Sequence, residues 1–327
     1  MIRSLQKRWR PESFQGSLSG RSYFEGWYYK IVDRGENSVI AIIPGVSLGE
    51  ESTHSFIQVL DGTRQTYDYY RYGIDEFKYS RDEFRIEVGN STFTTDRIEL
   101  QVQGREGIIS GELSFNDLRP WPGRLWSPGS MGALGLVPGI PCYHHVLSLD
   151  HRVSGQISVG DRILDFEGGR GYTEKSWGRS FPRRWIWVQS NHFEQPGTCF
   201  ILAFARMNLH SRPISGLTCG LFREKQHFEF CTWSGGRVTE MNVGERKVNI
   251  VLENPRNKLE LEAIQAATTK MLVPHIGGMT GSVFESLTSL VKFALLDKKG
   301  DTTLLEGTGR CAGVEFSDGG DGSRGDV

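Results

Sequence analysis

The chain has 327 residues, a formal net charge of −1 and 40 glycines. This length exceeds that of most single hydrophobic cores, so two domains are expected. The near-zero net charge gives no electrostatic basis for binding nucleic acid or an anionic membrane surface.

The five cysteines are odd in number and form no CxxC motif, which argues against a disulfide framework or a structural zinc site and favours reduced thiols in the cytoplasm. No secretory signal is visible, and no apolar run approaches the roughly 20 residues of a transmembrane helix, so a soluble protein, at most peripheral to a membrane, is expected.

The N-terminal residues 1–20 mix basic, Pro, Gly and Ser residues and predict an extended arm. The first strand begins at Tyr23. Because successive side chains of a strand point to opposite faces, Glu25, Trp27 and Tyr29 are expected to share one face. Both faces of this strand carry aromatic residues, which indicates that one meets a core and the other a cavity.

Short strand-like runs separated by turn signals follow along the first half of the chain. Such runs favour an all-β sandwich or barrel over βαβ units, and no long amphipathic helix is evident. Asp61-Gly62 is typical of a hairpin turn between two of them. The runs cover residues 38–43, 54–60, 65–72, 83–88, 97–102 and 108–115.

A Pro- and Gly-rich stretch, residues 118–141, interrupts this pattern. Prolines remove hydrogen-bond donors from a ladder, so the stretch cannot be a central strand. It is interpreted either as an interdomain linker or as an apolar lip at a cavity mouth that touches a membrane or admits a lipid. The predicted organisation is an arm over 1–20, a first β domain with this linker over 21–141, a second β domain over 142–316, and a disordered tail over 317–327.

Strand-like runs resume at Cys142, and Gly160-Asp161 is typical of another hairpin turn. A second irregular apolar stretch is predicted over 271–284, followed by a final hairpin over 287–316. The other runs of this half cover residues 199–207, 216–222, 227–233, 246–252 and 259–264.

The chemistry-bearing residues concentrate in residues 168–193, GGRGYTEKSWGRSFPRRWIWVQSNHF. Glu174 and Lys175 stand beside Trp177, and two arginines precede the alternating run of Trp185, Trp187, Gln189 and Asn191. The Tyr-x-Glu of this segment, followed closely by Trp, echoes the sequence over 23–27. The echo suggests one such motif in each of two β domains.

These residues also carry a family resemblance. The blocks SYFEGWYYKIVD, PCYHHVLSLDHRVSG, the segment over 168–193 and the closing GTGRCAGVEF resemble the tocopherol cyclase family, in that family's order. The resemblance implies two lipocalin-like antiparallel β-barrels, as in carotenoid hydratases and some fungal cyclases. It also implies closure of a prenylated hydroquinol to a chromanol, the ring-forming step of vitamin E biosynthesis.

Chromanol closure is redox-neutral and requires neither metal nor nucleotide. It needs a proton donor for the alkene, stabilisation of a tertiary cation, and a base or hydrogen-bond partner for the phenol. Burial can keep a carboxylic acid protonated as the donor, and aromatic faces can stabilise the cation. The first candidate for the acid is Glu174 and the second is Glu25, with Lys175 beside them. The remaining candidates are His144, Tyr28 and Tyr172 for the phenol, Trp27, Trp177, Trp185 and Trp187 for the aromatic wall, and Gln189 and Asn191 for orienting the quinol.

Structural alternatives stand beside these roles. Glu174 and Lys175 can instead belong to a buried ion network with Arg183 or Glu25, and the tryptophans can be core. The histidines near Cys142 fit satisfied core residues better than metal ligands.

Two further functions remain open: a non-catalytic carrier of an apolar isoprenoid or lipid, and an isoprenoid hydratase that uses water in place of the phenol. The expected partner is an apolar prenylated small molecule. Neither nucleic acid nor a protein partner is predicted.

Overall fold

The structure is a computed structural model that describes residues 10–49, 52–104, 107–123, 129–209, 212–276, 278–300 and 302–317. The first nine residues of the predicted arm, Trp126 and the predicted tail beyond residue 317 lie outside these ranges. The described chain consists of antiparallel strands with three short 3₁₀ turns, Ile74–Glu76, Gly132–Leu136 and Thr232–Ser234. The predicted all-β class is confirmed. No helix within the described ranges is long and apolar enough to span a membrane.

The chain divides into two compact units. Unit 1 comprises Met1–Phe181 and Leu272–Gly281, and unit 2 comprises Pro182–Met271 and Ser282–Val327.

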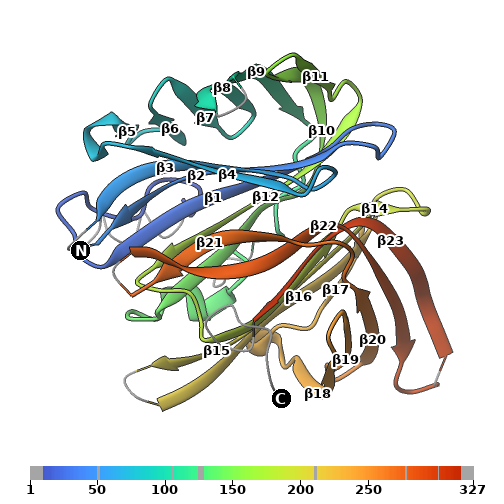
Figure 1. Cartoon of the computed structure of the whole chain (residues 1–327). Coiled ribbons are helices and arrows are strands. Elements are labelled where there is room, and N and C mark those ends of the chain that lie inside the picture. The colour runs from blue at the N-terminus through green and yellow to red at the C-terminus, as the bar shows by residue number, and fades with distance from the viewer. Residues whose placement is uncertain are drawn as a thin grey trace. The chain divides into compact units, whose positions relative to one another are not determined.

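The sheet of unit 1 has the strand order β4-β3-β2-β1-β12-β10-β9-β8-β7-β6-β5, with β11 paired to β10 (Figure 1). Alternating burial along β8 places Ile98, Leu100 and Val102 on the core face, as period-two patterning requires. The strands are β1 (Tyr23–Val32), β2 (Val39–Leu48), β3 (Thr53–Asp61), β4 (Thr66–Tyr72), β5 (Phe77–Tyr79), β6 (Arg85–Val88), β7 (Ser91–Thr94), β8 (Arg97–Gly104), β9 (Gly107–Asn116), β10 (Cys142–Val159), β11 (Arg162–Asp165) and β12 (Gly169–Gly178).

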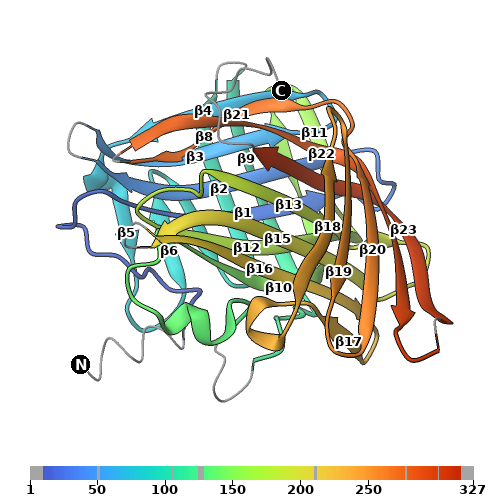
Figure 2. The same cartoon turned by 90° about the horizontal axis from the view of Figure 1, so that it is seen from below.

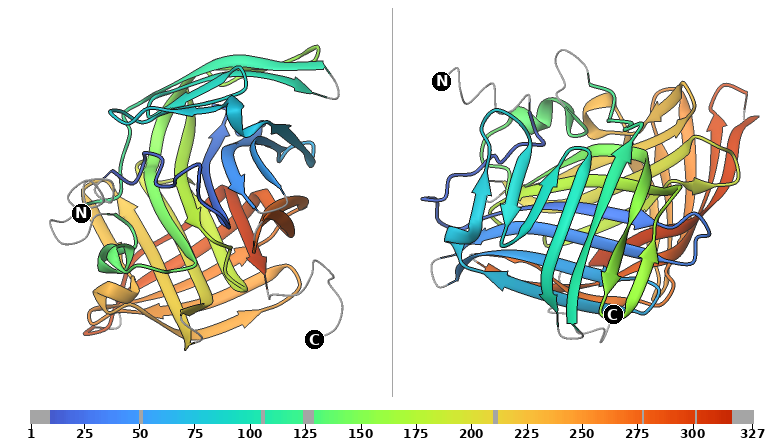
Figure 3. Two further views of the ribbon diagram at one scale, coloured as in Figure 1. Left: turned by 90° about the vertical axis from the view of Figure 1, so that its left-hand side faces the viewer. Right: turned by 90° about the horizontal axis from the view of Figure 1, so that it is seen from above.

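The core of unit 1 packs β1 against the segment of the sheet that contains β6 to β9. Trp27 stacks on Phe84 with ring centroids 5.7 Å apart, and Tyr29 lies 6.0 Å from Phe93 and 5.9 Å from Phe115. The sheet therefore curls so that β5–β9 face β1–β4 across the core, as Figure 3 shows for the cyan-green and blue strands.

The second sheet, most of which belongs to unit 2, has the order β17-β16-β15-β13-β23-β22-β20-β19-β18, with β14 paired to β23 and β21 to β22 (Figure 2). Its apolar core includes Val188, Leu202, Leu252 and Val314. The strands are β13 (Arg184–Ser190), β14 (His192–Phe193), β15 (Thr198–Leu209), β16 (Arg212–Arg223), β17 (Gln226–Glu229), β18 (Arg237–Val243), β19 (Lys247–Glu253), β20 (Asn257–Ile264), β21 (Thr269–His275), β22 (Gly278–Asp297) and β23 (Thr302–Ser317).

The structure corrects the predicted domain boundary at residue 142. Strand β10 pairs with β9 and β12 pairs with β1, so residues 142–181 complete unit 1 instead of opening unit 2. The two echoed Tyr-x-Glu segments are therefore adjacent strands of one sheet. The stretch over 271–284 is also not irregular, because most of it belongs to β21 and β22.

Candidate active site

Strand β12 lies at the centre of the unit 1 sheet and is buried along most of its length. It pairs with β1 on one side and with β10 on the other. Opposed residues share a face, so Glu174 lies with Tyr28 and Val146, whereas Lys175 lies with Trp27 and His145. The two consecutive charged residues therefore occupy opposite faces of the same strand.

The first face carries a hydrogen-bonded triad of Tyr172, Glu174 and His144. The Tyr172 hydroxyl donates to Glu174 Oε2 at 2.5 Å, and His144 Nε2 lies 2.9 Å from the same oxygen. Glu174 is only 8% exposed, so water competes little for these bonds. Short hydrogen bonds to a carboxylate are among the stronger ones in proteins.

The imidazole of His144 extends this triad by one more polar atom. Its Nδ1 is buried and has no hydrogen-bond partner among the described residues. The thiol of Cys142 is buried as well, and burial together with the charge of Glu174 raises the pKa of Cys142 to about 12. Cys142 is therefore protonated and uncharged at neutral pH, so it does not act as a thiolate nucleophile.

The second face carries a buried ion pair between Lys175 and Glu25, 2.5 Å apart and without exposed side-chain surface. Lys175 Nζ also donates to the carbonyl oxygens of Pro11 at 2.8 Å and Ser13 at 2.6 Å. The Glu25 carboxylate accepts the backbone N–H groups of Gln15 at 2.8 Å and Gly16 at 3.1 Å. The pair thus holds the N-terminal segment over 10–16 against the sheet.

Aromatic rings surround this ion pair. Lys175 Nζ lies 4.7 Å from the ring of Trp27 and 5.0 Å from that of Trp177, both within cation–π range. The Tyr23 hydroxyl bonds to Glu25, and burial followed by the charge of Glu25 raises the pKa of Tyr23. These contacts satisfy the charges of Lys175 and Glu25 locally.

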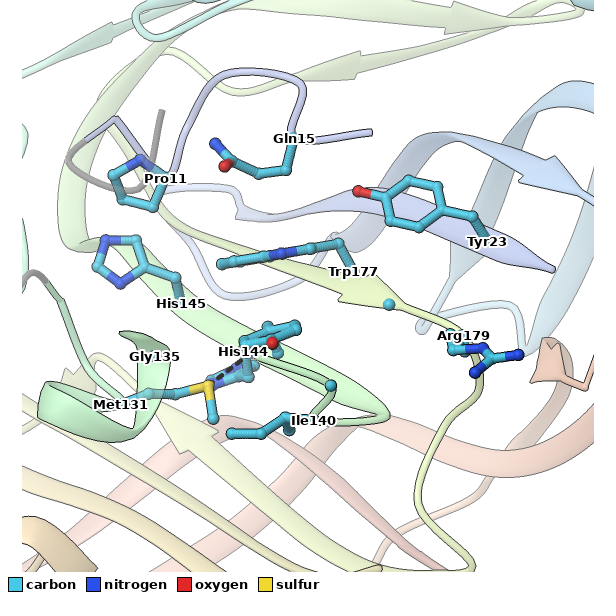
Figure 4. Close-up of a pocket in the computed structure, with 13 residues that line it drawn as sticks. Pro11, Gln15, Tyr23, Met131, Gly135, Ile140, His144, His145, Trp177 and Arg179 are labelled. Carbon is cyan, nitrogen blue, oxygen red and sulfur yellow. Dashed lines mark hydrogen bonds between the residues drawn. The ribbon is translucent and has the colours of Figure 1, made fainter. Parts of the chain in front are cut away.

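A cavity of about 350 Å³ lies at the end of β12 and β10. Figure 4 shows Pro11, Gln15 and Tyr23 on one side of Trp177 and Met131 and His144 on the other. The His144 backbone N–H donates to the thioether sulfur of Met131 at 3.1 Å, which joins the strand to the 3₁₀ turn of the Pro/Gly-rich stretch.

The structure separates the predicted site residues into three groups. The triad face brings together Tyr28, Tyr172, Glu174 and His144. The opposite face brings together Glu25, Trp27, Lys175 and Trp177, so the predicted alternative of a buried ion network holds for Lys175 with Glu25 but does not include Glu174 in that pair. The third group, in unit 2, comprises Trp185, Trp187, Gln189 and Asn191.

In unit 2, β13 places the first three residues of that third group on one face. The Trp185 indole N–H donates to Glu315, and both side-chain amide atoms of Gln189 are buried without a hydrogen-bond partner among the described residues. Asn191 follows the strand, and its Oδ1 lies 2.9 Å from His192 Nδ1.

Two residues of unit 1 were missed from the sequence. Lys30 is fully buried and stands opposite Tyr172 in the register, on the triad face. Tyr143 stacks on Trp177 with centroids 5.4 Å apart and an interplanar angle of 12°. Strand alternation predicts which face of β1 carries Lys30. The sequence does not show locally that β1 pairs with β12, so it does not place Lys30 opposite Tyr172.

The sequence profile of the family described as "Tocopherol cyclase-like" matches residues 133–319, more than half of the chain. The chain belongs to the tocopherol cyclase-like family. This confirms the resemblance carried by the sequence blocks.

A curated relative of this family, "Tocopherol cyclase, chloroplastic" of Zea mays, is 29% identical over 177 residues. The match covers 51% of this chain and 37% of the maize protein, so the chain spans little more than a third of that relative.

Two solved structures share the fold across both chains. CghA with Sch210972 superposes with a TM-score of 0.55 at 10% identity and covers 91% of this chain and 89% of its own. Kievitone hydratase from Nectria haematococca superposes with a TM-score of 0.52 at 9% identity and covers 90% of this chain and 88% of its own. At these identities the similarity concerns the fold alone, and it agrees with the predicted lipocalin-like class.

Proposed function

We propose that this protein is a cyclase- or hydratase-type enzyme that protonates an isoprenoid alkene. Within that class we propose closure of a prenylated hydroquinol to a chromanol, the reaction that the family resemblance implies. The observation that carries the proposal is the meeting of Tyr172 and His144 at one oxygen of the buried Glu174.

The proposed acid is the Glu174–His144 pair rather than either residue alone. His144 Nε2 and Glu174 Oε2 lie 2.9 Å apart, and a proton held between them is the one that we propose for transfer to the substrate. Tyr172 fixes the carboxylate from the other side, so its orientation does not depend on solvent. His144 also lines the 350 Å³ cavity, so we propose that the substrate reaches the pair from that side.

The proposed reaction conserves all atoms. The pair transfers a proton to the less substituted alkene carbon, the phenol oxygen bonds to the resulting tertiary cation, and the phenolic proton returns to the pair. General acid catalysis of this kind contributes typically about 10²–10⁴-fold to a rate. Water in place of the phenol would give hydration by the same steps.

The aromatic wall and the orienting amides remain proposals. Trp185, Trp187, Gln189 and Asn191 belong to unit 2, and their predicted role as substrate contacts stays a prediction that the proposed acid does not depend on. Glu25 and Lys175 are proposed as structural residues, since their hydrogen bonds are made to the N-terminal segment.

The experiment incubates the purified protein with prenyl benzoquinols of several chain lengths under reducing conditions. A product of unchanged mass is expected for a cyclase, and one heavier by a water molecule would indicate a hydratase. Absence of both products at every chain length would contradict the proposal. The variant Glu174→Gln is expected to lose turnover, and Glu167→Gln, an exposed carboxylate just before β12, is its matched control.

A further inference from the structure

Lys30 is a fully buried lysine of β1 on the same face of the sheet as the triad. It stands opposite Tyr172 in the register of β1 with β12, and Tyr28, two residues before it, stands opposite Glu174. Opposed side chains on one face have Cβ atoms about 4.5–5.5 Å apart, and diagonal neighbours remain within reach of long side chains. Lys30 therefore brings a positive charge to the Tyr172–Glu174 part of the triad.

The two strands that flank β1 carry one acidic residue. β2 has none, and β12 has only Glu174. The acidic residue of β1 itself, Glu25, lies on the opposite face, in the ion pair described above. Asp150 of β10 lies toward the start of β12, where it accepts hydrogen bonds of 2.9 and 2.6 Å from Arg170. Glu174 is thus the carboxylate that the neighbouring strands place beside Lys30.

The strand order sets the order of the groups on this face. β12 lies between β1 and β10, so Glu174 lies between Lys30 on one side and His144 on the other (Figure 1). Neighbouring strands are about 4.7–4.9 Å apart, so Lys30 starts one strand away from Glu174 and two strands away from His144. Because Coulomb energy falls with distance, the ammonium stabilises a negative charge on Glu174 more than it opposes a positive charge on His144.

The Glu174–His144 pair can hold its proton in two ways. A proton on Glu174 leaves both groups neutral, whereas a proton on His144 gives a carboxylate and an imidazolium. The ammonium of Lys30 favours the second arrangement, since a nearby opposite charge stabilises an ionised carboxyl group. The Tyr172 hydroxyl favours it too, because its hydrogen bond of 2.5 Å to Glu174 Oε2 stabilises the carboxylate.

Two other titratable groups of β10 stay uncharged next to the triad. Burial, followed by the charge of Glu174, raises the pKa of Cys142 to about 12. Burial, followed by two neighbouring charges, lowers the pKa of His145 to about 3. The two ion pairs at β12 are each neutral overall, so among the described residues of unit 1 the charge that acts most on the pair is that of Lys30.

We propose that Lys30 is a positioning residue that keeps Glu174 ionised, so that His144 carries the proton delivered to the substrate. This inference rests on the proposed function and assigns its acid to the imidazolium. The imidazolium gives one proton to the less substituted alkene carbon and becomes neutral imidazole. The phenolic proton, released when the phenol oxygen bonds to the cation, restores the imidazolium, and Glu174 keeps its charge throughout.

The test locates the proton in the protein without substrate, so it does not depend on turnover. Protein labelled with ¹⁵N-histidine is measured by NMR at pH 6, and the signals of His144 are assigned by their loss in His144→Gln. An imidazolium gives similar shifts for its two protonated nitrogens, whereas a neutral ring gives two widely separated averages. The unmodified protein is expected to show an imidazolium at His144, and a neutral ring there would overturn the proposal.

Lys30→Met removes the charge and retains an unbranched side chain. The ratio of imidazolium to neutral ring at His144 should fall at least about tenfold, because a charge beside a carboxyl group typically changes its ionisation equilibrium by about 10- to 1,000-fold. Lys30→Gln makes the same test if the methionine variant does not fold, and Lys30→Arg should retain the imidazolium. Lys78→Met, whose side chain is 73% exposed, is the matched control and should leave the ratio unchanged. An unchanged ratio in a folded Lys30→Met or Lys30→Gln would overturn the proposal.

Turnover separates this inference from the proposed function. With a prenyl benzoquinol, Lys30→Met should turn over at least about tenfold more slowly, since general acid catalysis contributes about 10²–10⁴-fold, and Lys30→Arg should retain most of the rate. If the unmodified protein turns over no substrate, the proposed function fails, while the NMR result still decides where the proton lies. Full turnover in a Lys30→Met variant that has lost the imidazolium would overturn the assignment of the acid to His144.

Discussion

Glu174 and Lys175 are consecutive residues of one buried strand, yet their surroundings differ in kind. Lys175 meets a carboxylate and two backbone carbonyls, whereas Glu174 meets a phenol and an imidazole. Backbone amide and carbonyl groups do not act as acids or bases near neutral pH, whereas imidazole does. Strand alternation places two consecutive charged residues on opposite faces of the sheet. Each can therefore have its own surroundings and its own proposed role, structural for Lys175 and catalytic for Glu174.

The two carboxylates show the same contrast. Glu25 is held by the Lys175 ammonium, by the Tyr23 hydroxyl and by two backbone N–H groups of the N-terminal segment, a set of contacts that anchors this segment. Glu174 shares its oxygen with two side chains that carry exchangeable protons. Of the two carboxylates first considered as the acid, this geometry favours Glu174.

The largest expected effect is on stability, at Lys175. Replacing Lys175 by Met leaves Glu25 buried without its cation and releases the carbonyls of the N-terminal segment, so the free energy of unfolding should fall by about 3–5 kcal/mol. Urea unfolding followed by tryptophan fluorescence measures this. Lys298→Met, at an exposed ion pair, is the control and should leave the midpoint unchanged. A midpoint for Lys175→Met as little changed as that of the Lys298→Met control would show that the Lys175–Glu25 ion pair does not stabilise the fold.

The next effect is on catalysis, at Tyr172. Tyr172→Phe removes one hydrogen bond to the Glu174 carboxylate, which is worth about 1.5–3 kcal/mol when the acceptor is charged. The free energy of unfolding should fall by about that amount, and the turnover rate with a prenyl benzoquinol should fall roughly tenfold to a hundredfold because the carboxyl group loses a contact that orients it. A variant with full activity would remove Tyr172 from the proposed triad.

A pH effect on stability is expected from His151. His151 lies on the core side, where its ring packs on Phe115, and burial followed by the charge of Arg170 lowers its pKa to about 3. The unfolded chain binds this proton near pH 6.5 but the folded protein does not, so stability is full above pH 6.5 and falls as the pH drops toward 3.

The slope from this one group is about 1.4 kcal/mol per pH unit. Urea unfolding at pH 7, 6, 5 and 4 measures it, and His151→Phe should reduce the slope. An unchanged slope in that variant would show that other groups cause the acid sensitivity.

The smallest effect is expected at Trp177. Trp177→Leu removes one cation–π contact with Lys175 and the stacking with Tyr143, with a cost on the order of 1 kcal/mol. Thermal unfolding measures this loss. A change as large as that of Lys175→Met would mean that the indole itself anchors the N-terminal segment.

The fold class could be predicted from the sequence because short alternating runs and turn residues are local signals. The domain boundary could not, since β10 and β12 join unit 1 through pairing with strands that lie far away in the chain. The stretch over 271–284 was misjudged because its glycines and Pro274 suggest a loop, whereas it lies in β21 and β22.

The candidate site was predictable in part. Alternation alone places Glu174 and Lys175 on opposite faces, and the family blocks indicate the segment that carries them. The partners were not predictable, because His144 meets Glu174 only through the register of β10 with β12, and Lys30 stands opposite Tyr172 only through the register of β1 with β12.

The most direct test of the central claim compares turnover and unfolding in Glu174→Gln. The amide keeps the size of the carboxyl group but cannot donate its proton. Product formation from a prenyl benzoquinol, followed by mass spectrometry, should fall at least about a hundredfold while the urea midpoint stays close to that of the unmodified protein. Unchanged turnover, or a loss of turnover that only accompanies unfolding, would contradict the assignment of the chemistry to the Glu174 face.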